Sequence, residues 1–290
     1  MPTNDYSLVA YFFTKAPTLS EDGKTIIYGL YPQTNVNDTS LISSLDSLKT
    51  PESNGWYLYN GDYYAKVSAK PCRPSWTFNN GTTIKSGTTY WFKCEPITWN
   101  ILSNTNGEYY IVSSVLLDAH CYYNSSSNRT IDGKTIYPNN YKYSDIRTWL
   151  NEDFYNSAFA LGNEYIQTTT VDNSAFTTDY SNNEYACDNT DDKVFLPSYQ
   201  DYINSSYGFS TSCDEADARR YCKPTDWARA RGAYYYTSSG SYQYNGYYWT
   251  RSPYSGYSGF AWCVIDDGSL YGDGDGTYFS VRPGLSIKIA

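Results

Sequence analysis

The C-terminal stretch from Tyr234 to Ala290 is organised by three short motifs: Trp249-Thr250-Arg251-Ser252-Pro253, Asp267-Gly268-Ser269-Leu270 and Val281-Arg282-Pro283-Gly284-Leu285. Between these motifs the chain is rich in tyrosine, serine, glycine and aspartate. A phenol offers a wide, rigid contact face with one polar group, and tyrosine set among serine, glycine and asparagine is the chemistry of antibody loops. We therefore expect this stretch to form a recognition surface.

The candidate ligand-binding residues are tyrosines and two aspartates of this stretch: Tyr234, Tyr236, Tyr242, Tyr244, Tyr247, Tyr248, Tyr254, Tyr257, Tyr271, Asp273, Asp275 and Tyr278. The alternative is that the tyrosines are strand residues, because tyrosine favours sheets. Neighbours such as Tyr234, Tyr235 and Tyr236 must point to opposite faces of any strand. We therefore expect about half of the tyrosines to be half-buried, and the rest to gather on one exposed face.

Composition indicates a folded, aromatic-rich chain. Of 290 residues, 40% are hydrophobic and 19% aromatic, whereas disordered chains lack aromatic residues. A core with one methionine and many aromatic and β-branched residues favours sheet and loop over a helix bundle. No internal repeat or linker divides the chain. We expect one domain, 1–290, with an N-terminal strand and hairpin portion (1–89), a scaffold portion (90–233) and a candidate ligand-binding portion (234–290).

Charge and hydropathy exclude several partners. The formal net charge is −9 and no basic cluster is present, so the electrostatic signature of a nucleic-acid-binding protein is missing. No apolar run approaches the roughly 20 residues that span a bilayer, so membrane insertion is not expected. The first residues lack the charged and apolar regions of a secretory signal. Either the protein is not exported by that route or a leader has been removed.

The seven cysteines are widely spaced and contain no Cys-x-x-Cys pair, so no zinc site is expected. Buried free thiols are favoured, and a bridge between Cys213 and Cys222 is the alternative. His120 is the only histidine and we expect it to be structural. The carboxylates between Asp266 and Asp275 lack the spacing of a calcium loop, so hairpin turns are expected there. The sequence thus predicts no catalytic residue, metal or cofactor.

Hydrophobic periodicity predicts four helices and a set of meandering strands. Strands are expected at residues 25–34, 90–94, 97–102, 109–112, 168–172 and 194–197, with a hairpin around Asn60-Gly61 and an exposed loop over 122–140. Helices are expected over 41–48 with Thr39 or Ser40 as cap, from Ser144, from Ser198 through Ile203, and over 225–232. The helix from Ser144 should bury Ile146, Trp149, Leu150, Phe154, Ala158 and Phe159, and expose Arg147, Asn151, Glu152 and Asp153.

Six motifs, in order along nearly the whole chain, resemble a bacterial family of extracellular or phage-type domains. These are Tyr28-Gly29-Leu30-Tyr31-Pro32-Gln33, Trp91-Phe92-Lys93-Cys94-Glu95-Pro96-Ile97-Thr98-Trp99, Ser144-Asp145-Ile146-Arg147-Thr148-Trp149-Leu150-Asn151, Asp192-Lys193-Val194-Phe195-Leu196-Pro197-Ser198, Trp249-Thr250-Arg251-Ser252-Pro253 and Val281-Arg282-Pro283. The family is related to the C-type-lectin-like fold in its formylglycine-generating-enzyme form. The resemblance implies an α+β fold with small antiparallel sheets, two main helices, much loop and a C-terminal ligand-binding face.

Variable proteins of diversity-generating retroelements use the same fold, and their diversified residues lie at the C-terminal end. Their mutagenesis acts on adenines, so that Asn codons become Tyr, Ser, Asp or Gly codons, and the composition of Tyr234 to Tyr278 is similar to such an outcome. The resemblance implies a non-enzymatic binding protein with a Tyr-rich surface for a protein or glycan on a cell or phage-host surface. It also favours an extracellular, cell-surface or phage-borne location.

Two other classes of function remain open. Catalytic formylglycine-generating enzymes hold copper with a pair of cysteines, and only Cys263 lies in the C-terminal stretch. An oxidase of that type would need Cys263 together with Cys222 or Cys213. The Glu-Pro-Asn or Gln-Pro-Asp calcium motif of sugar-binding lectins is also missing. A structural module of a surface or phage assembly is the third possibility, and in every case we assign Arg251 and Arg282 to the scaffold.

Overall fold

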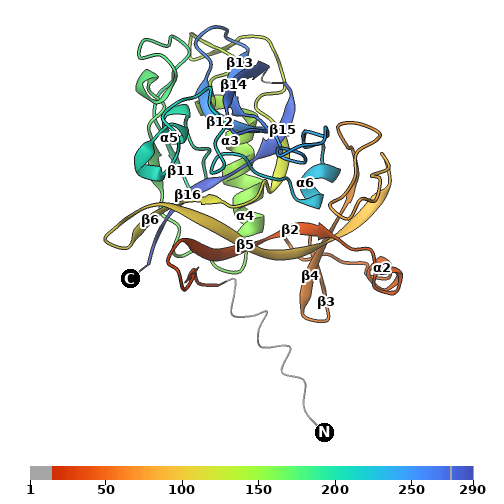
Figure 1. The fold of residues 1–290 in the computed structure, drawn as a ribbon. Coiled ribbons are helices and arrows are strands. Elements are labelled where there is room, and N and C mark those ends of the chain that lie inside the picture. Colours follow the sequence, from red (N-terminus) through yellow and green to blue (C-terminus); the bar gives the residue numbers. More distant parts are fainter. Residues whose placement is uncertain (1–14, 275, 290) are drawn as a thin grey trace.

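The larger sheet is built around one long strand, β5 (Thr89–Thr105), in a computed structural model that describes residues 15–274 and 276–289. Its strand order is β1 (Thr18–Leu19), β2 (Thr25–Asn35), β5, β4 (Asp62–Ser68) and β3 (Tyr57–Tyr59), with β6 (Glu108–Ser113) also on β5 and β16 (Gly284–Lys288) on β6 (Figure 1). The sequence predicted two strands where β5 is continuous. Pro96 lies opposite Leu30, next to a register shift that includes Gly29 at φ 77°, so this irregularity in β2 lets β5 pass through the proline.

Two hairpins of this sheet turn on Asn-Gly pairs. Asn60 and Gly61 have φ angles of 50° and 87° between β3 and β4, as the sequence predicted. Asn106 and Gly107, at 53° and 81°, make the same kind of turn between β5 and β6. Asparagine and glycine tolerate positive φ, which tight hairpin turns require.

The second sheet is formed by the C-terminal strands. Its order is β14 (Leu270–Gly274), β13 (Phe260–Val264), β12 (Tyr248–Pro253), β15 (Tyr278–Val281) and β7 (Asp118–Cys121), and it lies above the first sheet in Figure 1. Only the β12–β15 pair is parallel. Two-stranded hairpins are made by β8 (Arg129–Ile131) with β9 (Lys134–Ile136), and by β10 (Thr169–Val171) with β11 (Thr190–Asp192). The fold is therefore α+β with small, mostly antiparallel sheets.

All four predicted helices are present, and side-chain caps define their starts. Ser144 caps a helical segment that runs through α3 (Asp145–Trp149), a π-helical turn (Leu150–Phe154) and α4 (Tyr155–Ala158). Ser198 forms a capping box at α5 (Tyr199–Tyr202), and Thr225 caps α6 (Asp226–Ala230). The cap of α2 (Thr39–Asp46) was predicted wrongly. Asp38 occupies that position, because its carboxylate accepts from the amides of residues 40 and 41.

Three further corrections concern burial and strand formation. The predicted exposed loop 122–140 contains the β8–β9 hairpin and two fully buried residues, Tyr122 and Asn139. Tyr122 is drawn inward because its hydroxyl donates to the carbonyl of Arg251 at 2.7 Å. Residues 194–197 are buried as predicted, but they form only one isolated bridge, between Phe195 and Gly284. Three short 3₁₀ turns, Tyr141–Tyr143, Ala175–Thr177 and Ser205–Tyr207, complete the described elements.

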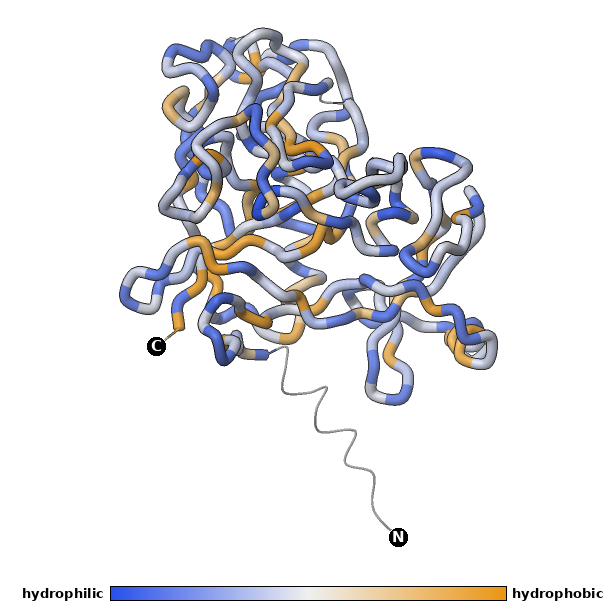
Figure 2. The backbone as a smooth tube through the Cα atoms, in the orientation of Figure 1, coloured by the Kyte–Doolittle hydropathy of each residue, from blue (hydrophilic) through white to orange (hydrophobic). Residues whose placement is uncertain are grey.

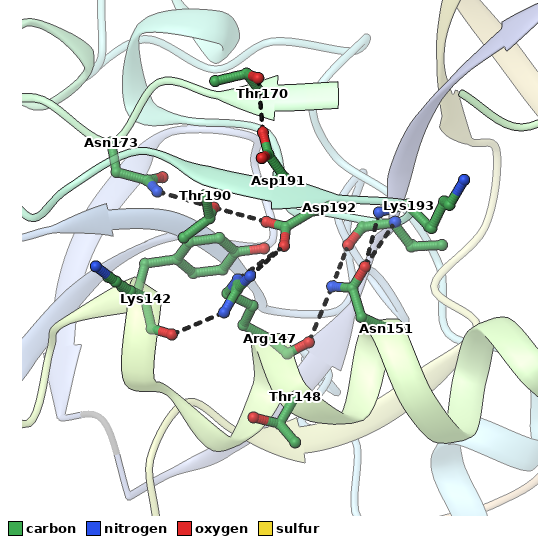
Figure 3. Close-up of polar contacts among 12 residues, drawn as sticks. Lys142, Arg147, Thr148, Asn151, Thr170, Asn173, Thr190, Asp191, Asp192 and Lys193 are labelled. Carbon is green, nitrogen blue, oxygen red and sulfur yellow. Dashed lines mark hydrogen bonds and ion pairs between the residues drawn. The ribbon is translucent and has the colours of Figure 1, made fainter. Parts of the chain in front are cut away.

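The helix that begins after Ser144 buries its predicted apolar face, but not all of its polar residues face solvent. Glu152 and Asp153 are exposed as predicted, whereas Arg147 and Asn151 are not. Arg147 donates to the fully buried carboxylate of Asp192, with Nη2 at 2.7 Å from Oδ1 (Figure 3). Asn151 donates to the carbonyl of Val194 at 2.9 Å and accepts from the amide of Lys193 at 2.7 Å. Spacing alone could not show that a partner strand covers this side of the helix.

This polar network fastens the helix to the β10–β11 hairpin. Thr190 donates to the second oxygen of Asp192 at 2.8 Å, and Asn173 donates to the hydroxyl of Thr190 at 3.0 Å (Figure 3). Asn173 and Thr190 are the two ends of the loop that connects β10 with β11. The ion pair therefore fixes the base of a long loop as well as the helix.

The core is dominated by aromatic and β-branched side chains, as the composition indicated. The largest hydrophobic cluster includes residues from Ile26 to Ile287, with Trp99, Trp249 and Phe92 fully buried among them. Trp99 is held by its indole nitrogen, which donates to the carbonyl of Tyr28 at 2.7 Å. Figure 2 shows hydrophobic segments along the strands in the middle of the molecule.

We expect Asp192→Ala to lower the free energy of unfolding by about 3–5 kcal/mol, because it leaves Arg147 without its carboxylate and also removes the acceptor of the Thr190 hydroxyl. Asp191→Ala is the matched control, since its side chain is exposed on the same strand, and it should cost less than about 1 kcal/mol. Urea unfolding followed by tryptophan fluorescence measures both. Equal losses in the two variants would contradict the assigned role of the network.

All seven cysteines lie in the described residues and are free, so Cys213 and Cys222 do not form a bridge. Cys72 is exposed, whereas Cys94, Cys121, Cys222 and Cys263 are buried. Burial also raises the pKa of the Cys187 thiol to about 11. Because the thiolate is the reactive form, these groups differ in both access and ionisation.

Iodoacetamide should therefore alkylate Cys72 first in the native protein at pH 8, and the four buried thiols only after unfolding in urea. Mass spectrometry of tryptic peptides gives the order of labelling. Rapid native labelling of Cys263, which lies in the main core, would show that the core is open to solvent.

Candidate binding site

A shallow pocket of about 390 Å³, here called the tip groove, lies where β13 begins and β14 ends. Three segments line it: Asn124–Ser126, Tyr257–Phe260, and residues 274, 276 and 277. The paired ends of β13 and β14 lie near the top of Figure 1. The groove is therefore made by loops from the C-terminal part of the chain, together with the segment that follows β7.

A buried asparagine holds the central segment of the groove. The side-chain amide of Asn139 donates to the carbonyls of Tyr257 and Phe260, at 3.2 and 2.9 Å. Its backbone amide donates to the carbonyl of Ser258 at 3.1 Å. The first segment is fixed by Asp145 in the first turn of α3, which accepts from the amide of Asn124 at 2.9 Å. The bonds to Asn139 hold one segment and the bond to Asp145 holds the other. Because Asn139 is buried and Asp145 belongs to a helix, the groove has a defined shape.

Tyr257 stands at the edge of the groove with 59% of its surface exposed, and its ring packs edge-on against Phe260 at 5.1 Å. Tyr254 is half-buried, and its ring lies 6.4 Å from that of Phe260. A Cβ atom at Gly272 would lie 2.9 Å from the Tyr254 ring, so glycine is required for the ring to lie flat on β14. Tyr254 also contacts Trp262, with ring centroids 5.2 Å apart.

A second loop with exposed aromatic side chains is bonded to the end of β12, and it was not among the predicted site residues. Phe176 and Tyr180, which are 77% and 55% exposed, belong to the loop whose base is fixed by Asp192. Hydrogen bonds join this loop to the end of β12: Asn183 donates to the carbonyl of Pro253 at 3.0 Å, Ser252 donates to the carbonyl of Thr177 at 2.8 Å, and Ser255 donates to Asp179. The sequence did contain one indication of this surface, because Phe176 is a large apolar residue among polar neighbours.

We call the groove together with Phe176, Tyr180 and Tyr257 the tip surface. The described residues that line the groove present hydroxyl, amide and phenol groups and backbone amides of glycine, and they include no carboxylate, imidazole or ammonium. Such groups can donate and accept hydrogen bonds over the whole groove without a charged partner. The described part of the lining can therefore bond to the hydroxyl and amide groups of a ligand.

The predicted tyrosines do not form one face. Tyr247 precedes β12 and Tyr254 follows it, and a six-residue strand separates its ends by about 20 Å. Tyr234 and Tyr247 pack against each other at 4.7 Å, and Trp76 covers Tyr234 at 5.3 Å. The prediction of a single surface was therefore wrong, because β12 carries the two parts of the stretch apart. The tyrosines before β12 that belong to this separate loop are Tyr234, Tyr236, Tyr242, Tyr244 and Tyr247.

Tyr248 is not a surface residue. It is fully buried, its hydroxyl donates to the carbonyl of Arg220, and it accepts from Arg282 Nη1 at 3.0 Å. Burial raises the pKa of this phenol to about 12. The prediction failed because Tyr248 begins a central strand, where tyrosine is a core residue.

The remaining candidates vary in exposure. Tyr271 and Tyr278 are 58% and 52% exposed, at the edge strand β14 and the start of β15, and Tyr244 is 39% exposed. Asp273 is half-buried in β14, and Asp275 lies outside the described residues. Partial burial is confirmed for five tyrosines, but the expectation that they are strand residues is wrong, because all five lie outside the strands: Tyr234, Tyr236, Tyr242, Tyr247 and Tyr254.

Arg251 and Arg282 have the scaffold role that the sequence predicted. Arg251 donates to the carbonyl of Leu196 at 2.9 Å, to that of Asp172 at 3.2 Å and to the carboxylate of Asp201 at 2.9 Å. Arg282 donates to the carbonyls of Ser113 and Arg220, both at 2.9 Å. Each guanidinium thus ties together segments that are distant in the sequence.

These features define an α+β domain with a loop-built surface at one end of its C-terminal sheet. The chain belongs to the family described as "Domain of unknown function (DUF6273)", which matches residues 106–289 and includes every segment of the tip groove. Comparisons with curated proteins and with solved structures give no match. Within the described residues, no helix has the length and apolar character that crossing a membrane requires.

The buried tyrosines should make the protein sensitive to alkali. Burial raises the pKa of Tyr31, Tyr110 and Tyr202 well above the ordinary value of 10.0, and that of Tyr248 to about 12. Because the unfolded phenols ionise near 10, the stabilisation they give is complete below pH 10 and is lost as the pH rises from 10 towards 12.

We therefore expect a sharp loss of structure above pH 10, and a class of tyrosines whose absorbance at 295 nm changes only when the circular dichroism signal collapses. Titration of the native protein followed by both signals tests this. A single smooth ionisation of all tyrosines, without unfolding, would contradict the burial of these rings.

Proposed function

We propose that this chain is a non-enzymatic recognition protein whose tip surface binds a protein or glycan partner on a cell or phage-host surface. The observation that carries the proposal is an exposed tyrosine, Tyr257, at the edge of a neutral polar groove that is held in shape by buried side chains. A preformed pocket with convergent polar groups is the usual form of a ligand site, and the exposed ring adds a contact face at its edge.

The chemistry of the groove favours a glycan among these partners. Sugar hydroxyls both donate and accept hydrogen bonds, as do the serine hydroxyls and the asparagine amide of residues 124–126. An exposed phenol ring adds a rigid apolar face at low entropic cost. Phe176 and Tyr180 would extend contact to a longer chain or to a protein.

We infer further that the fold is the C-type-lectin-like fold of the formylglycine-generating-enzyme type. This rests on the resemblance of the six motifs, and it agrees with small antiparallel sheets, two longer helical segments and a loop-built surface in the C-terminal part. A binding role is favoured over an oxidase role because Cys263 and Cys222 are buried in different hydrophobic clusters. Copper binding by that pair would require the core to rearrange.

We also propose that the C-terminal stretch is diversified by a retroelement. If so, a near-copy of its codons should lie beside a reverse transcriptase gene in the source genome. Substitutions between the copies should fall at exposed positions such as Tyr244, Tyr257, Tyr271 and Tyr278, and not at the buried Tyr248. A copy that varied mainly at buried codons would contradict the proposal.

The binding proposal predicts that Tyr257→Ala weakens binding to a retained glycan at least about tenfold, because a well-placed aromatic contact contributes about 2 kcal/mol or more. The measurement is a glycan array probed with the full chain, followed by calorimetry with the retained glycan. Leu58→Ala is the matched control, since Leu58 is 48% exposed on the β3–β4 hairpin at the other end of the molecule (Figure 1).

Both variants should melt at the temperature of the unchanged protein, because their side chains are in solvent. If the glycan is bound equally well after Tyr257→Ala, or if Leu58→Ala weakens it as much, the tip surface is not the binding site. If no glycan is retained on the array, the glycan form of the proposal fails and a protein partner is left.

A further inference from the structure

A second and larger pocket, of about 540 Å³, lies on the other sheet. It is bounded by the β1–β2 turn, by the paired strands β5 and β6, and by the loop that contains residues 207–221. This volume is in the range of small-molecule sites. Its walls differ from those of the tip groove, because they combine apolar, aromatic and cationic side chains. We call it the basic pocket.

The basic pocket has a positive lining in an acidic protein. Lys24, Arg219 and Arg282 all line it, and its described lining residues include no carboxylate, although the chain carries a net charge of −9. A cleft lined by one sign of charge attracts ligands of the opposite sign. The pocket therefore favours an anion.

Two acidic residues close in sequence to these cations, Asp22 and Asp217, form weak pairs or are already bonded. Asp22 approaches Lys24 only at 4.0 Å, with both side chains mostly in solvent, so that pair contributes little. Asp217 pairs with Arg220 at 3.5 Å and accepts from the amides of Ser210 and Arg219. Among the described residues, the guanidinium of Arg219 thus forms no ion pair with a carboxylate.

The Arg219 side chain packs against Gly208. Gly208 has a φ of 83°, and a Cβ atom there would lie 2.9 Å from Cζ of Arg219 and closer still to one of its terminal nitrogens. The absence of a side chain is what lets the guanidinium lie against this turn. Arg282 holds a fixed place at the base, because its Nε and Nη1 donate to the carbonyls of Ser113 and Arg220.

The rest of the lining includes apolar and aromatic side chains, among them the two neighbours of Gly208 in the chain. Leu102, Val112 and Phe209 are buried residues that contribute to it, and the half-buried rings of Tyr207 and Tyr221 stand beside them. A free inorganic anion would leave these side chains without a partner. An organic body attached to the anion would cover them and gain from burial of apolar surface.

We propose that the basic pocket binds a small organic carboxylate, with the carboxylate on Arg219 and Lys24 and the apolar body against Phe209 and the two tyrosines. Arg219 is suited to this role because a guanidinium donates two parallel hydrogen bonds to a carboxylate. The site is independent of the tip surface, since none of its lining residues belongs to the tip groove.

Benzoate is the probe, and benzamide is its uncharged analogue of nearly the same shape. Calorimetry and saturation-transfer NMR on the full chain should give saturable binding of benzoate, at least about tenfold tighter than that of benzamide, because charge-assisted bonds are the stronger ones. Arg219→Gln should weaken benzoate binding at least about tenfold. Lys24→Gln should weaken it less, because an ammonium does not form the two parallel bonds that a guanidinium forms with a carboxylate.

Arg73→Gln is the matched control, since Arg73 is exposed and lies outside the pocket, and it should leave benzoate binding unchanged. Equal binding of benzamide and benzoate, full retention after Arg219→Gln, or no saturable binding at about 10 mM would each overturn the proposal. Inorganic phosphate that binds as tightly as benzoate would overturn the assignment to an organic acid. None of these results depends on whether the tip surface binds a glycan.

Discussion

The interaction on which this fold most depends is the bond from a buried guanidinium to a backbone carbonyl. A loop cannot pair its own carbonyls as a helix or a sheet does, yet buried carbonyls need donors. Arg251, almost fully buried, supplies donors to Leu196 and Asp172 and also pairs with Asp201. Arginine suits this role because its five N–H groups point in fixed directions and the charge is permanent. Long loops can then lie in the interior without unpaired backbone groups.

The same logic explains how the tip surface obtains a shape although it is made of loops. Asp192 fixes the base of the β10–β11 loop through Arg147 and Thr190, and Ser252 and Asn183 bond this loop to the end of β12. Asn139 does the same for the turn at Tyr257. In each case at least one buried side chain takes part in the bonds that hold the loop. The side chains of Phe176 and Tyr257 remain exposed above these bonds.

Local features of the fold could be predicted from the sequence because they depend on neighbouring residues. The caps at Ser144, Ser198 and Thr225, the Asn60-Gly61 turn and the apolar helix face were all correct. The roles of Arg147 and Asn151 were not, since they depend on a strand more than 40 residues later in the chain. Separate strands were expected at 90–94 and 97–102, and the continuous β5 instead runs through Pro96 next to the register shift at Gly29 in its partner strand. These predictions therefore failed because the sequence did not show which distant segment each residue contacts. The local preference of each residue was read correctly.

The candidate site shows the same division. Tyrosine content led to the choice of the C-terminal stretch as the candidate site, and four of its tyrosines are exposed. Composition cannot show which tyrosines a strand places far apart. β12 places Tyr247 and Tyr254 at different ends and buries Tyr248 between them, so residues adjacent in sequence have unrelated surroundings. Phe176, 78 residues before Tyr254, lies in a loop that bonds to Pro253 and Ser255 through Asn183 and Asp179. The surroundings of each candidate residue are therefore set by the strand or loop that holds it, and not by its neighbours in the sequence.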